Sequence, residues 1–242
     1  MDSKRIKIRV SGEYACFTRP DLKVERMTYP CMTPSAARGV LEAILRKPEF
    51  FWHIEEIWIL SPIRFLSMRR NELEEKGQPN RPTIIEEKRV QRNSIILSRV
   101  DYLIIADIIV PEPTEKANSD KYLAMFVRRR DKGQCYHQPF FGCREFPVES
   151  FGKPHGDENS IPEDIPIGGM LLDIFYDENG KPRPVFFEAK ITQGRLKCGD
   201  IYRNEMWKTS HLKRSVPVSY DSNLEKWNSQ EEEELWKEGW PI

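Results

Sequence analysis

The sequence lacks any long apolar run. No stretch of its 242 residues approaches the roughly 18 to 20 consecutive apolar residues that span a bilayer. Its first ten residues, MDSKRIKIRV, also lack the apolar segment of a secretory signal. These absences predict a cytoplasmic protein with no membrane partner.

Cysteine and histidine are scarce as well. Five irregularly spaced cysteines do not suit a disulfide framework. Because no two of them have C-x-x-C spacing and only four histidines are present, we expect no metal site. Phosphate-binding loops, serine elbows and zinc-binding helix motifs are absent too, so no cofactor is expected. Cys16 and Cys143 are predicted to be buried structural thiols rather than nucleophiles.

Charge is balanced overall but unevenly distributed. The chain has 38 basic and 38 acidic residues, yet the segment from Asp221 onward has seven acidic residues and two lysines. An acidic tail behind a locally basic body is compatible with polyanion binding. We expect residues 202–242 either to be mobile or to contact a partner. Trp227, Trp236 and Trp240 favour a contact, since exposed tryptophans are unusual in disordered tails.

The first 150 residues predict the order strand, helix, strands, helix, strand. Residues 6–10 alternate between apolar and basic, as in a half-buried strand. Thr33 and Pro34 suit the N-cap and first position of an amphipathic helix that ends before Pro48. This order predicts an α+β unit of the ferredoxin-like type, which RNA-recognition domains also use.

Later segments complete the predicted organisation. The isoleucine- and valine-rich residues 94–110 predict a buried strand, and a second helix is expected with Ser119 as its N-cap and its end at Gly133. We therefore expect a ferredoxin-like domain over residues 1–150 with an inserted polar loop around 69–92. Residues 151–201 should form an antiparallel β extension, with a turn at Asp177-Glu178-Asn179-Gly180.

Basic residues gather in four clusters at predicted loops or element ends. The clusters are Arg19, Lys23 and Arg26; Arg69 and Arg70; Lys88, Arg89 and Arg92; and Arg128, Arg129 and Arg130. Arginine binds phosphate in a bidentate way, so the clusters predict RNA binding, and the predicted set also includes Arg38 and Arg144. Neighbouring rings that are predicted to stack on bases are Phe17, Tyr29, Tyr122 and Phe126. The alternative is a solvated surface of ion pairs with Glu25, Glu72 and Glu87.

Candidate catalytic residues lie in and after the second predicted helix. Metal-free RNA cleavage needs a base for the 2′-hydroxyl, a cation for the developing phosphate charge and an acid for the 5′-oxygen. Lys121 and Tyr122 at the helix entrance form one candidate group, and His137 is another. Taken alone, each residue is better explained as an ordinary exposed lysine, half-buried tyrosine or surface histidine.

Several long segments resemble the fifth CRISPR-associated family, subtype I-C. They are ACFTRPDLKVERMTYP with MTPSAARGVLEAI and KP (15–48), PIRF with RRNE (62–72), KY..MF.RRR.KGQC (121–135), GCREFP (142–147), GGMLLDIFY (168–176) and FFEAKITQGRL (186–196). The resemblance runs in register over roughly residues 6 to 200.

This resemblance implies a RAMP fold with a ferredoxin-like domain and a small C-terminal antiparallel sheet. It implies a metal-independent, sequence-specific endoribonuclease that cuts CRISPR repeat RNA, leaves a 2′,3′-cyclic phosphate and retains the crRNA 5′ handle. The expected partners are the large and backbone subunits of the type I-C Cascade surveillance complex, with target DNA as a further ligand of the basic groove.

The family's catalytic residues carry over in part. The family's lysine falls on Lys121, but its following histidine is replaced by Tyr122, and Leu45 stands where some members have tyrosine. Our hypothesis is that Lys121 stabilises the phosphate charge while Tyr122 or His137 transfers protons. The alternatives are a non-catalytic cap on the 5′ handle and a general RNA-recognition protein outside CRISPR systems.

Overall fold

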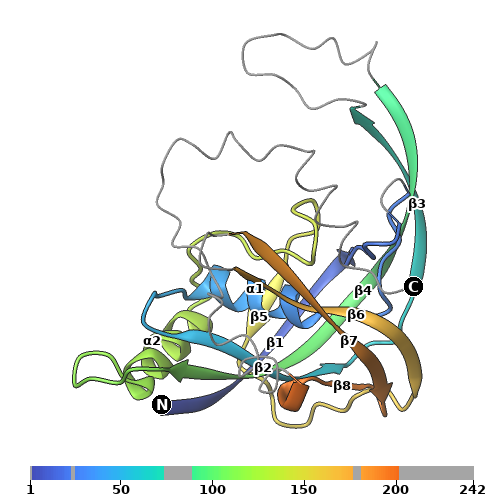
Figure 1. Ribbon diagram of the computed structural model, residues 1–242. Helices are drawn as coiled ribbons and strands as arrows, with labels where there is room; N and C mark the ends of the chain where they lie inside the picture. Colours follow the sequence, from blue (N-terminus) through green and yellow to red (C-terminus); the bar gives the residue numbers. More distant parts are fainter. Residues whose placement is uncertain (1, 23–24, 74–88, 177–180, 202–242) are drawn as a thin grey trace, which may run out of the picture.

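The computed structural model describes residues 2–22, 25–73, 89–176 and 181–201 (Figure 1). The predicted tail at 202–242, the turn at 177–180 and Lys23 lie outside this part of the chain. Within it, the protein is mostly β, with a curled antiparallel sheet and two α-helices.

The elements alternate at first and end in strands. They are β1 (Asp2–Ala15), α1 (Pro34–Ile44), β2 (Phe51–Ile59), β3 (Phe65–Leu73), β4 (Arg89–Val110), α2 (Ser119–Asp131), β5 (Ser150–Gly152), β6 (Ile165–Tyr176), β7 (Pro182–Thr192) and β8 (Arg195–Lys197). The predicted order of strand, helix, strands, helix, strand is therefore found from β1 to β5, and residues 140–148 precede β5 as a loop.

One sheet runs through the whole described molecule. Its strand order is β5-β1-β4-β2-β8-β7-β6, and β3 pairs separately with β4. The expected C-terminal strands β6 and β7 do pair with each other, but the short strand β8 joins them to the edge of β2. The expected small C-terminal sheet is therefore continuous with the main sheet.

Local sequence explains where both helices begin. The Thr33 hydroxyl accepts the amide N–H of Ala36 at 3.2 Å, as its predicted N-cap role requires. In α2 the cap is Asn118, one residue earlier than predicted, and its side chain accepts the amide N–H of Lys121 at 2.9 Å. Ser119 is buried instead and donates to Asp2 through both its backbone and its hydroxyl.

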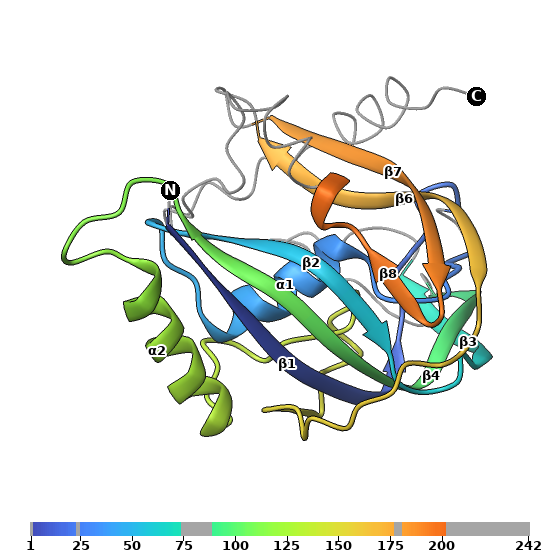
Figure 2. The ribbon, with the colours of Figure 1, turned by 90° about the horizontal axis from the view of Figure 1, so that it is seen from below.

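The core lies between the sheet and the helices. Figure 2 shows α2 beside β1, and the sheet curls so that α1 packs against both β2 and β6. Trp52 of β2 is fully buried between Phe50, at 5.3 Å between ring centroids, and Phe126 of α2, at 5.0 Å. Each such aromatic pair stabilises the fold by about 0.5–1.5 kcal/mol beyond its buried area.

Strands β3 and β4 form a two-stranded ribbon that projects from the sheet, which we call the β3–β4 ribbon (Figure 1). Its pairing runs from Phe65 opposite Leu97 to Leu73 opposite Arg89. The segment expected as a polar loop around 69–92 is thus paired strand at both ends, and the residues between lie outside the described part. Polar residues occupy these strands because much of the ribbon is exposed.

The β6–β7 pair is irregular. Its register shifts between Pro166 and Gly168 and again between Leu171 and Asp173. Gly168 has a φ of 81°, a left-handed conformation that favours glycine. These bulges bend β6 and increase its twist.

Candidate nucleic-acid interface

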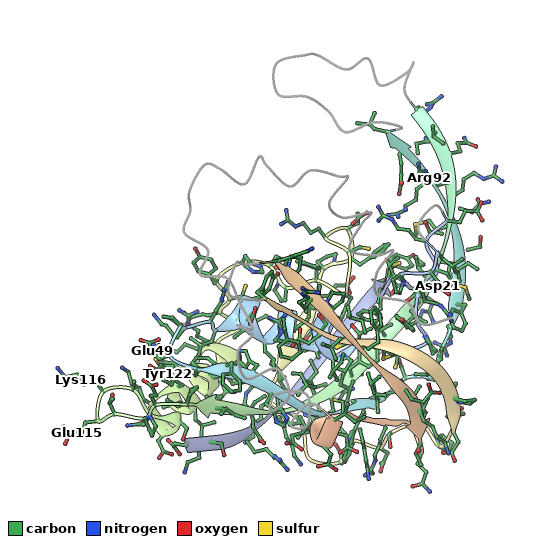
Figure 3. The ribbon with its side chains drawn as sticks, in the orientation of Figure 1. Asp21, Glu49, Arg92, Glu115, Lys116 and Tyr122 are labelled. Carbon is green, nitrogen blue, oxygen red and sulfur yellow. The ribbon has the colours of Figure 1, made fainter. Side chains whose placement is uncertain are left out.

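Arginines from three of the four predicted basic clusters meet beside the β3–β4 ribbon. Arg70 of β3 lies directly opposite Arg92 of β4, so both project from the same face. Arg26 comes from the loop between β1 and α1, and its carbonyl accepts the amide N–H of Ile95 at 2.8 Å. We call these three residues the arginine cluster, and Figure 3 shows Arg92 on the ribbon.

Two carboxylates lie among the three guanidinium groups. Arg70 contacts Glu145 at 2.7 Å and Glu72 at 3.1 Å. Arg26 lies 3.5 Å from Glu145, and Arg92 lies 3.9 Å from Glu72. Burial raises the pKa of Glu145, but its backbone amide and Arg70 lower it, and the lowering prevails. The three guanidinium groups outnumber these two carboxylates by one, before the thiol of Cys143 beside Arg26 is counted.

Part of this charge faces solvent. The side chains of Arg26 and Arg92 are 34% and 32% exposed, whereas that of Arg70 is 15% exposed. Within the described residues, the buried Nε of Arg70 has no hydrogen-bond partner. Arg144 is exposed in the neighbouring loop, while Arg69 projects from the opposite face of the ribbon because adjacent strand residues alternate.

A pair of cysteines lies next to the arginine cluster. The sulfurs of Cys16 and Cys143 lie 3.6 and 3.9 Å from the Thr18 hydroxyl, and Arg26 donates to the Cys143 sulfur at 3.8 Å. The hydrogen bond with Cys16 lowers the pKa of Cys143, and Thr18 and Arg26 lower it further against the effect of burial. The same bond and burial raise the pKa of Cys16. Cys16 is buried, as predicted, whereas Cys143 is only half-buried, and the prediction that neither thiol is a nucleophile stays a prediction.

A glycine makes this close approach possible. Gly142 has a φ of 80°, and a Cβ there would collide with the carbonyl oxygen of Cys16. The amide of Cys16 also donates to the carbonyl of Phe141 at 3.0 Å. The loop that carries Cys143 is thereby held against the chain that leaves β1.

Lys121 and Tyr122 lie together at the start of α2. Lys121 is exposed; its ammonium donates to the Lys116 carbonyl at 2.6 Å and lies 5.6 Å from the centroid of the Tyr122 ring. Tyr122 is buried against Phe50, with ring centroids 4.9 Å apart. Burial, and to a lesser degree Glu49, raise the pKa of Tyr122, so its phenol is a proton donor rather than a base at neutral pH.

His137 lies at the other end of α2. The ten steps along α2 from Lys121 to Asp131 cover about 15 Å of helix axis, and His137 follows beyond Asp131. It is exposed, with Nδ1 3.2 Å from the carbonyl oxygen of Gln138. The structure therefore brings Lys121 and Tyr122 together but does not bring His137 to them. Leu45, at the family's tyrosine position, is buried in the core.

The fourth basic cluster mainly supports packing. Arg129 donates to the carbonyl of Ile44 at the end of α1 at 2.7 Å, and Arg130 donates to the carbonyl of Lys7 at 3.0 Å. Both side chains thus donate hydrogen bonds to backbone carbonyl groups of the protein itself. Only Arg128 of this cluster is fully exposed.

Arg38, another predicted RNA-binding residue, lies inside the fold. It contacts Asp173 of β6 at 2.7 Å and Glu42 at 2.8 Å, and the Asp173 side chain is fully buried. Burial lowers the pKa of Arg38, but the two carboxylates raise it to well above its usual value. Arg38 therefore links α1 to β6 through a buried ion pair with Asp173.

Two other predicted residues remain at the surface. Arg19 pairs with Asp21 at 2.9 Å and lies over the ring of Tyr29. Arg89 is exposed at the start of β4.

The predicted stacking rings are not available to bases. They are Phe17, Tyr29, Tyr122 and Phe126, and all four are buried, so that prediction is wrong. Exposed rings are found instead at Phe65 on the ribbon, which is 52% exposed, and at Tyr136, which is 72% exposed. The sequence analysis missed both rings because the residues around Phe65 and Tyr136 do not show whether each ring faces solvent or the core.

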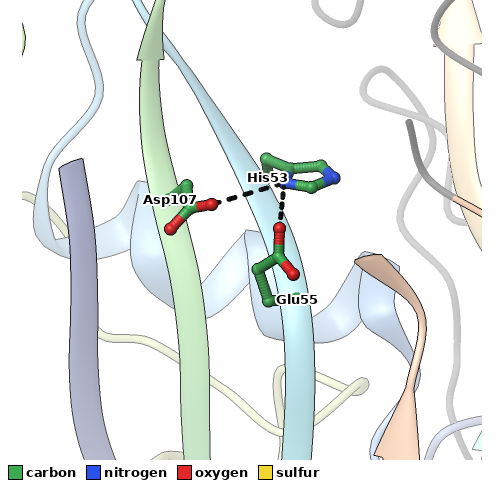
Figure 4. A group of neighbouring side chains, drawn as sticks. All are labelled: His53, Glu55 and Asp107. Atoms are coloured by element: carbon green, nitrogen blue, oxygen red, sulfur yellow. Dashed lines mark ion pairs between the residues drawn. The ribbon is translucent and has the colours of Figure 1, made fainter. Parts of the chain in front are cut away.

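A further charged group, also missed, joins three strands. His53 lies 3.1 Å from Glu55 and 3.9 Å from Asp107 (Figure 4), and its Nε2 lies 3.1 Å from the carbonyl oxygen of Gly199. Arg5 binds both oxygens of Asp107, at 2.8 and 3.0 Å. Burial raises the pKa of Asp107, but His53 and Arg5 lower it overall. Arg5 pairs with both Glu55 and Asp107 and so links β1 to β2 and β4. We expected no metal site, but His53, Glu55 and Asp107 each offer a ligand atom, all within 4.8 Å of one another, so these residues could hold a metal ion.

Fold and site together define a mostly β protein with a cationic two-stranded ribbon. The family model for Cas5d, described as a CRISPR-associated protein (Cas5), matches residues 5–196. The chain belongs to this family of CRISPR-associated proteins, as the sequence resemblance indicated.

Two curated relatives are similar over nearly their whole length. The CRISPR pre-crRNA endoribonuclease Cas5d of Thermus thermophilus is 39% identical, over 83% of this chain and 96% of the relative. The protein of the same name from Mannheimia succiniciproducens is 38% identical, over 84% and 99%.

Solved structures share the fold. A functionally uncharacterized protein, SMU1763c of Streptococcus mutans, superposes with a TM-score of 0.58 at 22% identity, covering 80% of this chain and 91% of that one. A crystal structure of a CRISPR-associated protein also has a TM-score of 0.58, at 24% identity, with coverage of 81% and 93%. Neither helix in the described part of the chain has the length and apolar character to cross a membrane.

Proposed function

We propose that this chain is an endoribonuclease that cleaves the repeat of precursor CRISPR RNA without a metal ion. One observation carries the proposal: both curated relatives, at 39% and 38% identity, are named CRISPR pre-crRNA endoribonucleases. These matches cover 83% and 84% of this chain, so the likeness extends well beyond a shared core.

The chemistry is attack of a 2′-hydroxyl on the adjacent phosphate, which expels the 5′-oxygen and leaves a 2′,3′-cyclic phosphate. Lys121 is the proposed stabiliser of the phosphate charge, because its ammonium is exposed at the start of α2. Tyr122 is the proposed proton donor, since its raised pKa keeps the phenol protonated. His137 belongs to a separate location and is the weaker candidate for this step.

The arginine cluster is the proposed contact for RNA phosphates. Three guanidinium groups that meet at one place, with the side chains of Arg26 and Arg92 34% and 32% exposed, support this role. The strand order β5-β1-β4-β2 supports a ferredoxin-like RAMP unit beneath it. We further propose that the protein acts in the cytoplasm, retains the 5′ handle and joins the large and backbone subunits of a type I-C Cascade complex near target DNA.

A non-catalytic cap on the 5′ handle is the second candidate. The observation that favours it is the distribution of the predicted catalytic groups. Lys121 and His137 lie at opposite ends of α2, while Tyr122 and Leu45 are buried. A site reduced to one exposed lysine binds phosphate more readily than it transfers protons.

Cleavage of a labelled cognate repeat hairpin in excess EDTA tests both candidates. We expect a single cut by the wild type and a loss of at least about 100-fold in Lys121→Ala, as when one charge-stabilising group is removed from an active site. Lys132→Ala, an exposed lysine at the other end of α2, is the matched control. Tight handle binding without any cut by the wild type would instead establish the cap.

A further inference from the structure

The cysteine pair beside the arginine cluster has features that no RNA contact requires. Cys16 and Cys143 are far apart in sequence, yet their sulfurs share the hydroxyl of Thr18, and the Cys143 sulfur also lies 3.6 Å from the Cys16 carbonyl oxygen. The left-handed Gly142 lets the two backbones touch. Such backbone proximity is what a disulfide between two segments needs.

The two thiols differ in exposure and in protonation, so that Cys143 can react first and Cys16 second. Cys143 is half-buried, so a small molecule can reach it, and Arg26, Thr18 and the Cys16 thiol all favour its thiolate. Cys16 is fully buried and stays protonated. Reactive cysteines are found in partly exposed, electropositive surroundings of the kind that surrounds Cys143.

The other cysteines lack this arrangement. Cys31 and Cys198 are fully buried, and burial raises the pKa of each thiol. Cys135 is half-buried after α2. It therefore provides a natural control for accessibility.

We propose that Cys143 and Cys16 form a redox-active pair that a hydroperoxide converts to an intramolecular disulfide. In the first step the Cys143 thiolate attacks one peroxide oxygen, an S–O bond forms and the O–O bond breaks. The peroxide is reduced by two electrons and leaves as an alcohol, or as water from hydrogen peroxide, after taking a proton from solvent.

In the second step Cys16 attacks the sulfenic sulfur of Cys143. An S–S bond forms, the S–O bond breaks, and hydroxide leaves as water with the proton from the Cys16 thiol. Two thiols have then lost two electrons in total, which matches the single peroxide consumed. The product links the end of β1 to the loop that carries Glu145.

Oxidation also changes the arginine cluster, a consequence that rests on the proposed function. The disulfide removes the negative thiolate next to Arg26 and so raises the net charge facing the RNA. We expect oxidised protein to bind repeat RNA about twofold to fivefold more tightly, the range for one screened charge contact. Thiol reduction should reverse the change.

Peptide mapping under non-reducing conditions tests the pair without RNA. The reduced full-length protein is treated with hydrogen peroxide, blocked with an alkylating agent and digested. We expect one crosslinked peptide joining Cys16 to Cys143, which thiol reduction removes. Absence of this crosslink, or equal oxidation of Cys135 and Cys143, would overturn the proposal.

Variants separate the two steps. Cys16→Ser should stop the reaction at the Cys143 sulfenic acid, trapped as a dimedone adduct, and Cys135→Ser should leave the crosslink intact. Because Cys16 is buried, thermal unfolding is used to check that Cys16→Ser folds. If this variant does not fold, the peptide map of the wild-type protein tests the proposed disulfide. Repeat-RNA affinity is then measured on the mapped sample. If the crosslinked protein still binds and cuts RNA with unchanged affinity, the expected effect of the disulfide on RNA binding would be wrong. The disulfide itself would stand, because the peptide map establishes it separately.

Discussion

The helical side of the molecule and the β3–β4 ribbon use arginine differently. At the helices, Arg38, Arg129 and Arg130 bind buried carboxylates or backbone carbonyls of the protein itself. At the ribbon, Arg26, Arg70 and Arg92 all approach Glu72, and the first two also share Glu145, so three guanidinium groups surround two carboxylates and remain partly exposed.

The difference shows that a run of cations in sequence does not predict its role. The consecutive Arg128, Arg129 and Arg130 look most like a phosphate-binding patch, yet two of them hold the fold. Arg26, Arg70 and Arg92 are dispersed in the sequence and converge in space. Figure 3 places Arg92 and Tyr122 at opposite ends of the view, so the two regions are separate surfaces.

Arg38→Ala should have the largest effect on stability. It leaves the fully buried Asp173 without its cation, which costs about 3–5 kcal/mol in the free energy of unfolding. Chemical denaturation measures this loss, and the exposed Arg128→Ala should change stability by less than about 0.5 kcal/mol. Similar free energies of unfolding for the two variants would mean that the Arg38–Asp173 ion pair does not stabilise the fold.

Arg70→Ala should weaken binding of repeat RNA rather than the fold. Loss of a charge-assisted phosphate contact is expected to raise Kd about tenfold. The slope of log K against log salt should also become shallower by about 0.7 to 0.9. Arg128→Ala is the control, and an equal loss of affinity there would contradict a special role for the arginine cluster.

Arg129→Ala should have the opposite profile. The change removes one hydrogen bond to the Ile44 carbonyl and is expected to lower the free energy of unfolding by about 1 kcal/mol. Repeat-RNA affinity at equal folded concentration should stay unchanged. A clear loss of affinity in a variant that is still fully folded would mean that the helical side also contacts RNA.

Acidification should protonate the Cys143 thiolate, which lies beside the arginine cluster, at a lower pH than it protonates an ordinary thiolate. The hydrogen bond from Cys16 lowers the pKa of Cys143 to about 6, so its thiolate persists until the pH falls through that value. Free thiols lose their thiolate below about pH 8.5. The pH dependence of Cys143 alkylation, followed by mass spectrometry, measures the midpoint. Arg26→Ala should raise it, because the variant removes a cation that favours the thiolate.

Much of the fold follows from local sequence. Alternation identified β1, and Thr33 with Pro34 fixed the start of α1 where the structure has it. The start of α2 was displaced by one residue because Asn118 and Ser119 are both good caps, and only the tertiary contact of Ser119 with Asp2 distinguishes them.

The candidate site was less predictable because its contacts are long-range. Sequence identified Arg26, Arg70 and Arg92 as basic residues, but Glu145, which joins two of them, is 75 residues from Arg70. Nothing local indicated that Cys143 would lie against Arg26. Whether a residue near a basic cluster faces solvent or the core depends on the packed sheet and could not be read from the sequence.

The irregular strand β6 also protects the protein from self-association. Within the described residues β6 is the last strand of the sheet, and a regular edge of this length would offer unpaired N–H and C=O groups to a second chain. Its two bulges break the spacing of those groups, and Pro166 has no N–H to donate. A neighbouring copy therefore meets an edge that it cannot extend in register, so high local concentrations need not lead to aggregation through β6.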